Sequence, residues 1–414
     1  MKMICTTLTL LLSCGSSPGV ASAQQPPTSA SPPAAATPSP REQARDISAE
    51  LDKIIEKHKI PGMVALAIEG RRVIAQGAAG VRARGHPEKI TIDDKMHLGS
   101  CTKAMTATLC AKLVERGDLQ WEINLAEAFA RNEPPVPEVW RPVTLAQLLT
   151  NTGGVPGSLD KDGLWARLWK MHENGPEPRQ ALLDGVLGYQ PVAKPGEKFE
   201  YSNGGFAIAG HIAETKMKEK YEELLRRDLF HPLDIRSGGF GPPAGKDDFT
   251  QPWGHTADGK PVEWGHGADN PTAITPAGRV HMSIGDWGKF VSLHLRGERG
   301  EPDTEKYLKP GTFKKLHTPG TAVGSNYAMG WAVEKRPWAK GGQAGDTGRV
   351  LMHSGSNTMW FCVTWVAPEK NFAVLVCCNQ GNGSAACDEA CGALIKAWRE
   401  REAAKASEKP NSKP

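Results

Sequence analysis

The hydrophobic and polar positions of the chain follow strand-like patterns near its two ends and helix-like patterns between them. Near the beginning, the pattern predicts a helix over residues 47–58, then two strands over residues 63–68 and 72–77 joined by a tight turn at Glu69 and Gly70. Runs rich in aromatic, β-branched and other apolar residues return only near the C-terminus, over residues 327–333, 350–353, 359–366 and 372–378.

The two ends of the chain are therefore expected to build one antiparallel sheet. Residues 368–371 separate the last two strand-like runs as a hairpin turn would, because proline and asparagine favour turn conformations. The long middle of the chain has mostly helical patterns. We predict an α/β (α+β) fold, in which an antiparallel sheet from the N- and C-terminal segments is flanked by helices and carries an inserted, mostly helical lobe.

One stretch, residues 96–117, organises the rest, with Gly99 as a flexible entry to a helical pattern. Met105, Leu109 and Leu113 recur every fourth position, other apolar residues occupy most of the remaining sides, and Gly117 closes the run. Apolar residues on nearly every side predict a helix that is buried in the centre of a domain.

Ser100 and Lys103 lie at the start of this predicted helix. A spacing of three residues places them on one face, about 4.5 Å apart along the helix axis. The positive end of the helix and partial burial both discourage a lysine from keeping its proton, so the pair could act as a base beside a nucleophile. The alternative is an ordinary N-cap serine with a solvated lysine. A second Ser-x-x-Lys, Ser158 to Lys161, follows glycines and a proline that indicate a loop, and we set it aside.

Two later segments carry further candidate residues. Tyr201 and Asn203 stand two residues apart before a predicted helix, so in an extended segment they point the same way. By default such residues are a packing tyrosine and an N-cap asparagine. His353, Gly355 and Ser356 lie between two predicted strands, where small residues allow a substrate to approach the sheet edge. The alternative there is a hairpin with an incidental histidine.

The three motifs together resemble a known family. Ser-x-x-Lys on a buried helix, Tyr-x-Asn about a hundred residues later and His-x-Gly on a late strand occur in this order in the class C β-lactamase family of penicillin-recognising serine hydrolases. Relatives in that family include D-alanyl-D-alanine carboxypeptidases, D-amino acid peptidases and esterases. The resemblance covers residues 43–396 and extends to residues 148–152, 195–196, 230–233 and 329–331.

The resemblance implies a β-lactamase/transpeptidase-like fold and acyl transfer in two steps. Ser100 is then the nucleophile that forms an acyl-enzyme, while Lys103 and Tyr201 share the proton transfers. The sequence leaves open which of the two is the base. A tyrosine with the usual pKa of about 10 would need a nearby cation to ionise, and Lys103 could be that cation.

The substrate-binding residues that the resemblance implies are Asn203, His353, Gly355 and Ser356. Asn203 is expected to hydrogen-bond to the substrate and to the lysine amine, and the backbone N–H groups of Ser100 and Ser356 are the implied oxyanion hole. Class C β-lactamases carry lysine at the position of His353. A histidine there resembles the esterase and peptidase relatives. Because an imidazole holds a carboxylate less firmly than an ammonium group, efficient β-lactam hydrolysis is not expected. Asn151 replaces a family histidine and is expected to lie far from any assigned role.

Composition divides the chain into parts. Small residues at Ala21, Ser22 and Ala23 after a short apolar run suit signal-peptidase cleavage, which predicts an exported protein, periplasmic or secreted. A lipoprotein-like box ending at Cys14 is the alternative, and membrane attachment is expected only if Cys14 is lipidated. The expected parts are a signal peptide (1–23), a disordered Pro/Ala/Ser-rich linker (24–42), a β-lactamase-related serine hydrolase domain (43–398) and a charged tail (399–414).

Charge and cysteine content exclude several function classes. A net charge of +4 without a basic cluster gives no support for a nucleic-acid partner. Of nine cysteines, two lie in the predicted leader and seven remain, which we expect to be mostly buried thiols. A bridge from Cys362 to Cys377 or Cys378 is the alternative. No metal or cofactor is expected, because metal-binding spacings are missing and His255 and His266 are better explained as surface or pocket-lining residues.

Three functions are compatible with these features. The leading hypothesis is an exported serine hydrolase that acts through an acyl-enzyme on small esters or on D-amino acid amides and peptides. The second is a β-lactamase or D-alanyl-D-alanine carboxypeptidase. The third is a catalytically idle module that binds peptides. In each case, the expected partner is a small molecule or a peptide.

Overall fold

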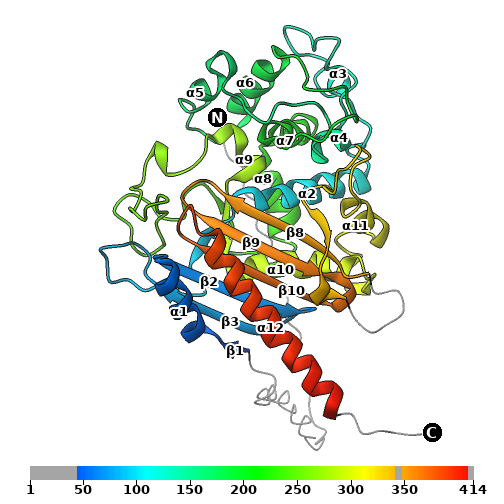
Figure 1. Cartoon of the computed structure of the whole chain (residues 1–414). Coiled ribbons are helices and arrows are strands. Elements are labelled where there is room, and N and C mark those ends of the chain that lie inside the picture. Colours follow the sequence, from blue (N-terminus) through cyan, green and yellow to red (C-terminus); the bar gives the residue numbers. More distant parts are fainter. Residues whose placement is uncertain (1–43, 341–346, 409–414) are drawn as a thin grey trace, which may run out of the picture. The chain divides into compact units, whose positions relative to one another are not determined.

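The computed structural model describes residues 44–340 and 347–408. The predicted signal peptide, Cys14 and the linker lie outside these residues. The described part contains a seven-stranded sheet with the order β1-β3-β2-β10-β9-β8-β7, shown in Figure 1. Its strands are β1 (Arg45–Asp46), β2 (Gly62–Glu69), β3 (Arg72–Gly80), β7 (Ala332–Lys335), β8 (Arg349–Ser356), β9 (Phe361–Ala367) and β10 (Phe372–Cys378).

The two ends of the chain form one sheet, as predicted. Strand β2 pairs antiparallel with β10, so that Val64 lies opposite Cys377. The hairpin between β9 and β10 is also confirmed, since Phe372 pairs with Ala367 and Asn371 takes the left-handed conformation between them. Only the short β1 runs parallel to its neighbour, β3.

One predicted strand was wrong. Of residues 327–333, only the last two belong to a strand: β7 begins at Ala332, and Tyr327 makes only an isolated bridge to that residue. The chain turns back on itself between them, because Gly330 has a φ of +83° and Ala328 N–H donates to Trp331 O at 2.7 Å. The apolar residues of this segment line a turn, and periodicity alone did not separate the two cases.

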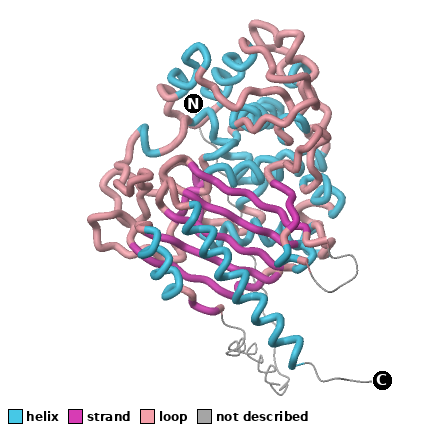
Figure 2. The backbone as a smooth tube through the Cα atoms, in the orientation of Figure 1, coloured by secondary structure: helices cyan, strands magenta, loops and turns pink. Residues whose placement is uncertain are grey.

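Alternating side chains of the sheet pack into two layers of helices (Figures 1 and 2). On β10, Val374 and Val376 pack on the side covered by α1 (Ser48–His58) and α12 (Ser384–Glu408), while Leu375 packs on the opposite side with α10 (Ile284–Gly297). Because successive strand residues point to opposite faces, a continuous apolar strand such as this must be buried on both.

Helix α12 corrects the expected boundary of the tail. The helix continues past residue 398 to Glu408, and its Arg401 donates to Glu69 Oε2 at 2.6 Å. Trp398 stacks on Phe372, with ring centroids 4.2 Å apart. The first residues of the segment expected to be a charged tail therefore belong to a helix that is bound to the sheet.

The helical lobe is inserted between β3 and β7, as predicted, and is arranged around α2 (Thr102–Arg116). All but four of the residues of α2 are fully buried, which agrees with the apolar pattern on nearly every side. A second, three-stranded sheet lies within the insertion. Its strands are β4 (Lys95–His97), β6 (Val280–Ser283) and β5 (Gly239–Phe240), and the other helices are α3 (Leu125–Ala128), α4 (Leu145–Leu149), α5 (Leu164–Leu168), α6 (Pro176–Leu187), α7 (Asn203–Met217), α8 (Tyr221–Leu225), α9 (Thr275–Gly278) and α11 (Pro310–Leu316).

The described cysteines are all free and buried, so neither of the two bridges considered above is present among them. Cys362 and Cys377 are paired across β9 and β10, and Cys362 Sγ lies 3.6 Å from Cys101 Sγ. Among the residues that the structure describes, no helix has both the length and the apolar character needed to cross a bilayer.

Candidate active site

Ser100 lies in a sharp connection between a strand and a helix. The chain leaves β4, makes the single 3-10 turn η1 (Gly99–Cys101) and enters α2 at Thr102. Gly99 has a φ of +46°, and a Cβ on it would lie only 2.4 Å from the backbone nitrogen of Ser356. Only glycine fits this position, because it combines the left-handed conformation with a close backbone approach. The turn therefore brings Ser100 directly beside the end of β8.

Lys103 is fully buried and its amine has three oxygen neighbours. Nζ lies 3.0 Å from Ser100 Oγ, 2.7 Å from Asn203 Oδ1 and 2.9 Å from Ala277 O. Burial lowers the pKa of Lys103 to about 7 because the protein interior disfavours the charged form. Near neutral pH, a large fraction of the molecules therefore carries a neutral amine next to the serine hydroxyl.

The partners of Lys103 identify the role that the amine can take. Asn203 Oδ1 and Ala277 O can only accept hydrogen bonds, so they use the two N–H groups of a neutral amine. A protonated amine donates to Ser100 Oγ as well, whereas the neutral amine leaves its lone pair for Ser100 Oγ, whose hydroxyl can then donate. This arrangement is a proton acceptor aimed at a hydroxyl group, as general-base catalysis requires.

Tyr201 and Asn203 are held by the start of α7. The default assignment of Asn203 as the N-cap was wrong: Ser202 is the cap, and its side chain accepts from Gly205 N–H at 3.2 Å. Asn203, in the first turn, is thereby free to bind Lys103. The Tyr201 ring lies with its centroid 4.8 Å from Lys103 Nζ.

Asn151 lies against this segment, which corrects the expectation that it is far from the site. Glu200 N–H donates to Asn151 O at 2.8 Å, and Ser202 N–H donates to Asn151 Oδ1 at 3.1 Å. These two bonds hold the residues on either side of Tyr201. Asn151 itself has a φ of +56°, a left-handed conformation that asparagine tolerates better than most residues.

The hydroxyl group of Tyr201 is not ionised in the free protein and so is not a base before substrate binds. Loss of solvation raises its pKa well above the usual value, and the hydrogen bond with Ser100 offsets only part of that shift. The residue is still 37% exposed, so the ring forms part of the accessible surface of the site. A neutral tyrosine in this place can pass a proton but does not remove one first.

His353 is a buried, neutral ring on β8. Burial and the nearby Lys103 charge lower the pKa of His353 to about 3. Its Nδ1–H donates to Ser354 O at 2.6 Å, and its Nε2 accepts from the Tyr327 hydroxyl at 3.0 Å. Tyr327 also contacts the Tyr201 ring edge-on, at 5.9 Å between centroids. The sequence analysis did not predict Tyr327 as a site residue. It placed Tyr327 only at the start of the predicted strand 327–333.

Gly355 and Ser356 complete the sheet side of the site. A Cβ on Gly355 would lie 2.0 Å from Leu98 O, so glycine is required for the strand to pack on the turn that carries Ser100. Ser356 is exposed and its backbone adjoins Gly99, as described above. The structure thus brings all the predicted site residues together, namely Ser100, Lys103, Tyr201, Asn203, His353, Gly355 and Ser356.

The segments that were set aside lie apart from this arrangement. Ser158 hydrogen-bonds to Asp160 in a loop, with no helix to align it with Lys161. His255 is not a surface residue: it is buried, donates to Asn379 O and accepts from Arg84 N–H. Within the described ranges, no group of three or more histidine, cysteine, aspartate or glutamate side chains is arranged to hold a metal ion.

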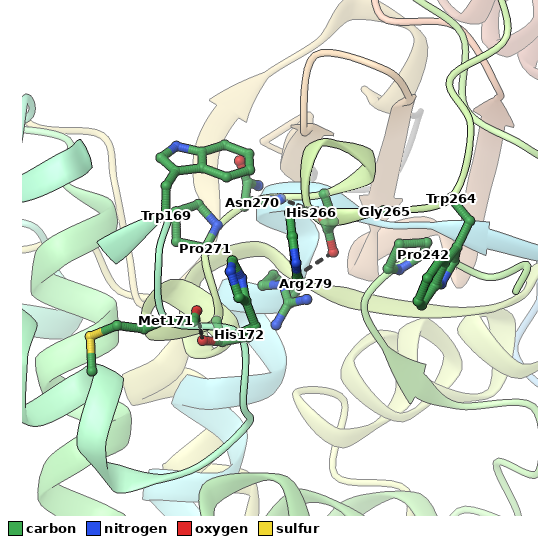
Figure 3. A pocket seen from close by; sticks show the side chains of 12 residues that line it. Trp169, Met171, His172, Pro242, Trp264, Gly265, His266, Asn270, Pro271 and Arg279 are labelled. Atoms are coloured by element: carbon green, nitrogen blue, oxygen red, sulfur yellow. Dashed lines mark hydrogen bonds and ion pairs between the residues drawn. The ribbon is translucent and has the colours of Figure 1, made fainter. Parts of the chain in front are cut away.

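His266 does line a pocket, as expected. Its ring stacks on His172 with centroids 3.3 Å apart, and the pair stands at the centre of a cavity of about 360 Å³ (Figure 3). Trp169, Trp264 and Arg279 contribute other parts of the lining.

Comparison with known proteins identifies the family. The model of the Beta-lactamase family matches residues 46–393. Penicillin-binding protein 4 of Amycolatopsis lactamdurans is 28% identical over 338 residues, covering 80% of this chain and 84% of that protein. Protein flp of Staphylococcus aureus is 23% identical over 348 residues, covering 81% of this chain and 63% of that protein.

Solved structures share the fold. The octameric penicillin-binding protein homologue from Pyrococcus abyssi superposes with a TM-score of 0.66 at 23% identity, covering 84% of this chain and 76% of that one. D-alanine carboxypeptidase AmpC from Burkholderia cenocepacia has a TM-score of 0.64 at 18% identity, covering 85% and 97%. The chain belongs to the Beta-lactamase family, and the family and fold support a serine hydrolase-type enzyme.

Proposed function

We propose that the protein is an exported serine hydrolase that forms an acyl-enzyme on Ser100 and acts on small esters or on D-amino acid amides and peptides. The observation that carries this proposal is the buried amine of Lys103, which lies 3.0 Å from the Ser100 hydroxyl and whose pKa is lowered to about 7. A serine hydroxyl is a weak nucleophile at neutral pH and needs such a base.

The first half of the reaction forms the acyl-enzyme. Lys103 Nζ takes the proton of Ser100 Oγ while Oγ bonds to the substrate carbonyl carbon, and the backbone N–H groups of Ser100 and Ser356 bind the resulting oxyanion. The bond to the leaving group then breaks. That group takes the proton back from Lys103, with the neutral Tyr201 hydroxyl able to relay it.

The second half repeats these steps with water. Lys103 accepts a proton from the water molecule as its oxygen attacks the acyl carbon, and the proton passes to Ser100 Oγ when the ester bond breaks. Lys103 ends neutral and Ser100 ends protonated, so that the cycle is closed. An amine with a pKa of about 7 suits both directions, because it holds and releases a proton with similar ease at neutral pH.

The sheet side of the site supports the choice of substrate. With a pKa of about 3, His353 is neutral and its Nε2 is occupied by Tyr327, so no permanent cation stands there to bind a carboxylate. That favours neutral esters and amides over substrates recognised by a carboxylate. Among solved structures of this fold, one is named as SurE with D-Leu and another as a D-alanine carboxypeptidase, which supports testing D-amino acid substrates.

The test is a hydrolysis panel of short-chain nitrophenyl esters, D-alanyl peptides and a chromogenic cephalosporin. We expect ester turnover that falls about a thousandfold in Ser100→Ala, because the nucleophile is lost. Ser158→Ala is the matched control, since it removes the serine of the other Ser-x-x-Lys, and should act like the wild type. Equal rates in Ser100→Ala and wild type would overturn the proposal.

The second function, a β-lactamase or D-alanyl-D-alanine carboxypeptidase, draws support from the name of the penicillin-binding relative. Lasting covalent labelling of Ser100 by a fluorescent penicillin, or rapid cephalosporin turnover, would favour it. The idle-module alternative expects no labelling by a fluorophosphonate probe. The thiol of Cys101, the residue after Ser100, offers no binding group to a peptide, since it is buried and donates to His353 O.

We also propose export, on the basis of the apolar run and small residues before Ala23. Mass spectrometry of the protein purified from its native host would test it. A mature N-terminus at Gln24 is expected, whereas a lipid-modified N-terminal Cys14 would indicate membrane anchoring, and an intact N-terminus would contradict export.

A further inference from the structure

Asp269 is a buried carboxylate close to the site that the steps above do not use. It lies between the short 3-10 turns η4 (His266–Ala268) and η5 (Thr272–Ile274), and 3% of its surface is exposed. Burial opposes ionisation, but the adjacent His97 and Arg279 outweigh it and lower the pKa of Asp269 to about 2. A carboxylate that is kept ionised inside a protein is costly unless each oxygen has partners.

One oxygen of Asp269 reaches the turn that carries Ser100. Oδ1 lies 2.9 Å from His97 Nε2, a close electrostatic contact in which the two atoms are not aligned as a hydrogen bond, and His97 Nδ1 accepts the backbone N–H of Gly99 at 3.1 Å. Since a backbone N–H can only donate, Nδ1 must be unprotonated and Nε2 must carry the ring proton. His97 therefore links the carboxylate to the residue directly before Ser100, through one defined tautomer.

The same oxygen reaches the end of β8. Asn357 Nδ2 donates to Asp269 Oδ1 at 2.9 Å, and Asn357 Oδ1 accepts from Met359 N–H at 3.2 Å. Asn357 is buried and directly follows Ser356. The other oxygen, Oδ2, is 3.2 Å from Arg279 Nε, which balances the charge.

We propose that Asp269 is a positioning residue that sets the spacing between the Ser100 and Ser356 backbone N–H groups; this inference rests on the proposed function. Asp269 Oδ1 contacts His97, which accepts the N–H of Gly99, the residue before Ser100. The same oxygen accepts a hydrogen bond from Asn357, the residue after Ser356. An oxyanion hole works only when both donors are already aimed at the place where the charge develops. A rigid, ionised anchor between two chain segments far apart in sequence provides that alignment.

Gly99 explains why a spacing device is needed at this point. Gly99 and Ser356 meet by backbone contact, with no side chain between these two residues to set their distance. A shift of β8 relative to the turn would separate the two donors. Asp269 prevents such a shift because it holds both segments from one side.

The test compares Asp269→Asn with Asp286→Asn. Asp286 is also buried and ionically paired, since it accepts from the backbone N–H groups of Arg236 and Ser237 and pairs with Lys289, but it contacts none of the site residues. It therefore reports the general cost of losing a buried carboxylate. Acylation rate, KM and melting temperature are measured for both variants with a nitrophenyl ester.

We expect Asp269→Asn to lower the acylation rate about 10- to 100-fold while KM changes less than about threefold, because only transition-state stabilisation is lost. A thionoester substrate is compared with the oxygen ester. A general structural defect would slow both substrates equally and leave the ratio of their rates unchanged. Sulfur accepts hydrogen bonds poorly, so a functioning oxyanion hole prefers the oxygen ester. The oxo-to-thiono rate ratio should therefore fall about fivefold or more in Asp269→Asn and stay unchanged in Asp286→Asn.

An unchanged oxo-to-thiono ratio in a folded Asp269→Asn would overturn the inference, even if turnover fell. Should Asp269→Asn fail to fold, Asn357→Ala leaves Asp269 and its contact with His97 in place while it removes the bonds to Asp269 and to Met359 N–H. The same oxo-to-thiono ratio must fall in this variant for the inference to stand. The result is separable from the proposed function. If Ser100→Ala remained active, the proposed function would fail first, whereas a dead Ser100→Ala with a normal Asp269→Asn would reject this inference alone.

Discussion

The helical side and the sheet side of the site differ in how they handle charge. On the helical side, Lys103 has three hydrogen-bonding neighbours and a pKa of about 7, so it exchanges a proton at physiological pH. On the sheet side, His353 has a pKa of about 3 and Tyr327 a pKa well above its usual value, so both stay neutral. Both sides are buried, yet only one titrates where the enzyme would work.

The difference assigns proton transfer to the helical side and substrate recognition to the sheet side in the proposed function. Burial lowers the pKa of both bases. An amine pKa that starts at about 10 moves into the neutral range, whereas an imidazole pKa that starts at about 6.5 moves below it. The same desolvation thus leaves an amine that can accept a proton near neutral pH on one side and a neutral hydrogen-bonding surface on the other. Four changes would break or sharpen this contrast.

The largest effect is expected for Lys103→Met, which keeps most of the volume and removes the base. Acylation should fall about a thousandfold, since loss of a general base typically costs between two and four orders of magnitude. Pre-steady-state release of nitrophenol measures it. Lys112→Met, at a half-buried position of the same helix, is the control. If Lys103→Met kept most of its activity, Tyr201 would have to be the base.

The next effect concerns the contact between the two sides. Gly99→Ala should destabilise the protein by about 2–4 kcal/mol and lower activity about 100-fold, because the new Cβ meets the Ser356 backbone and displaces it. Urea unfolding and ester turnover measure the two quantities. Gly117→Ala has the same kind of positive φ but nothing within 4 Å of its Cβ. It should cost only about 1–2 kcal/mol from backbone strain and leave turnover unchanged.

The pH profile tests the contrast directly. Since neutral Lys103 is the active form, kcat/KM for an ester should rise with pH through about 7 and fall about tenfold per unit below it. His353 titrates near 3 and should add no inflection above pH 4. A second ionisation near 6.5 that disappeared in His353→Gln would show that the sheet side does titrate, against our expectation.

The smallest effect is expected for His353→Lys, which places a cation on the sheet side. KM for a D-alanyl peptide with a free carboxylate should fall about fivefold relative to that for a neutral ester, because the ammonium group attracts the anion. The new charge also disfavours protonation of Lys103, so the acidic limb of the pH profile should move to lower pH. Equal KM changes for both substrates would mean that the carboxylate does not bind here.

Sequence patterns predicted the site residues more fully than their surroundings. Ser100 and Lys103 were placed by helical spacing, and the sheet from both chain ends by strand periodicity, because these features are local or repeat along the chain. Tyr327 was taken for part of a strand, and Asn151 for a residue without a role. Neither has a local signal for its contacts, since each acts through residues at least 26 positions away in the chain.

What the sequence determined by itself was the identity of the elements: a buried helix starting with a serine and a lysine, a tyrosine and an asparagine before another helix, and a histidine on a late strand. These follow from side-chain type and local spacing. Only the tertiary structure decided that the Lys103 amine meets Ser100, which bases are desolvated enough to change their pKa, and that Asp269 lies between the turn that carries Ser100 and the end of β8. Those properties depend on distances between segments that are far apart in the chain and on the exclusion of water, and local sequence patterns encode neither.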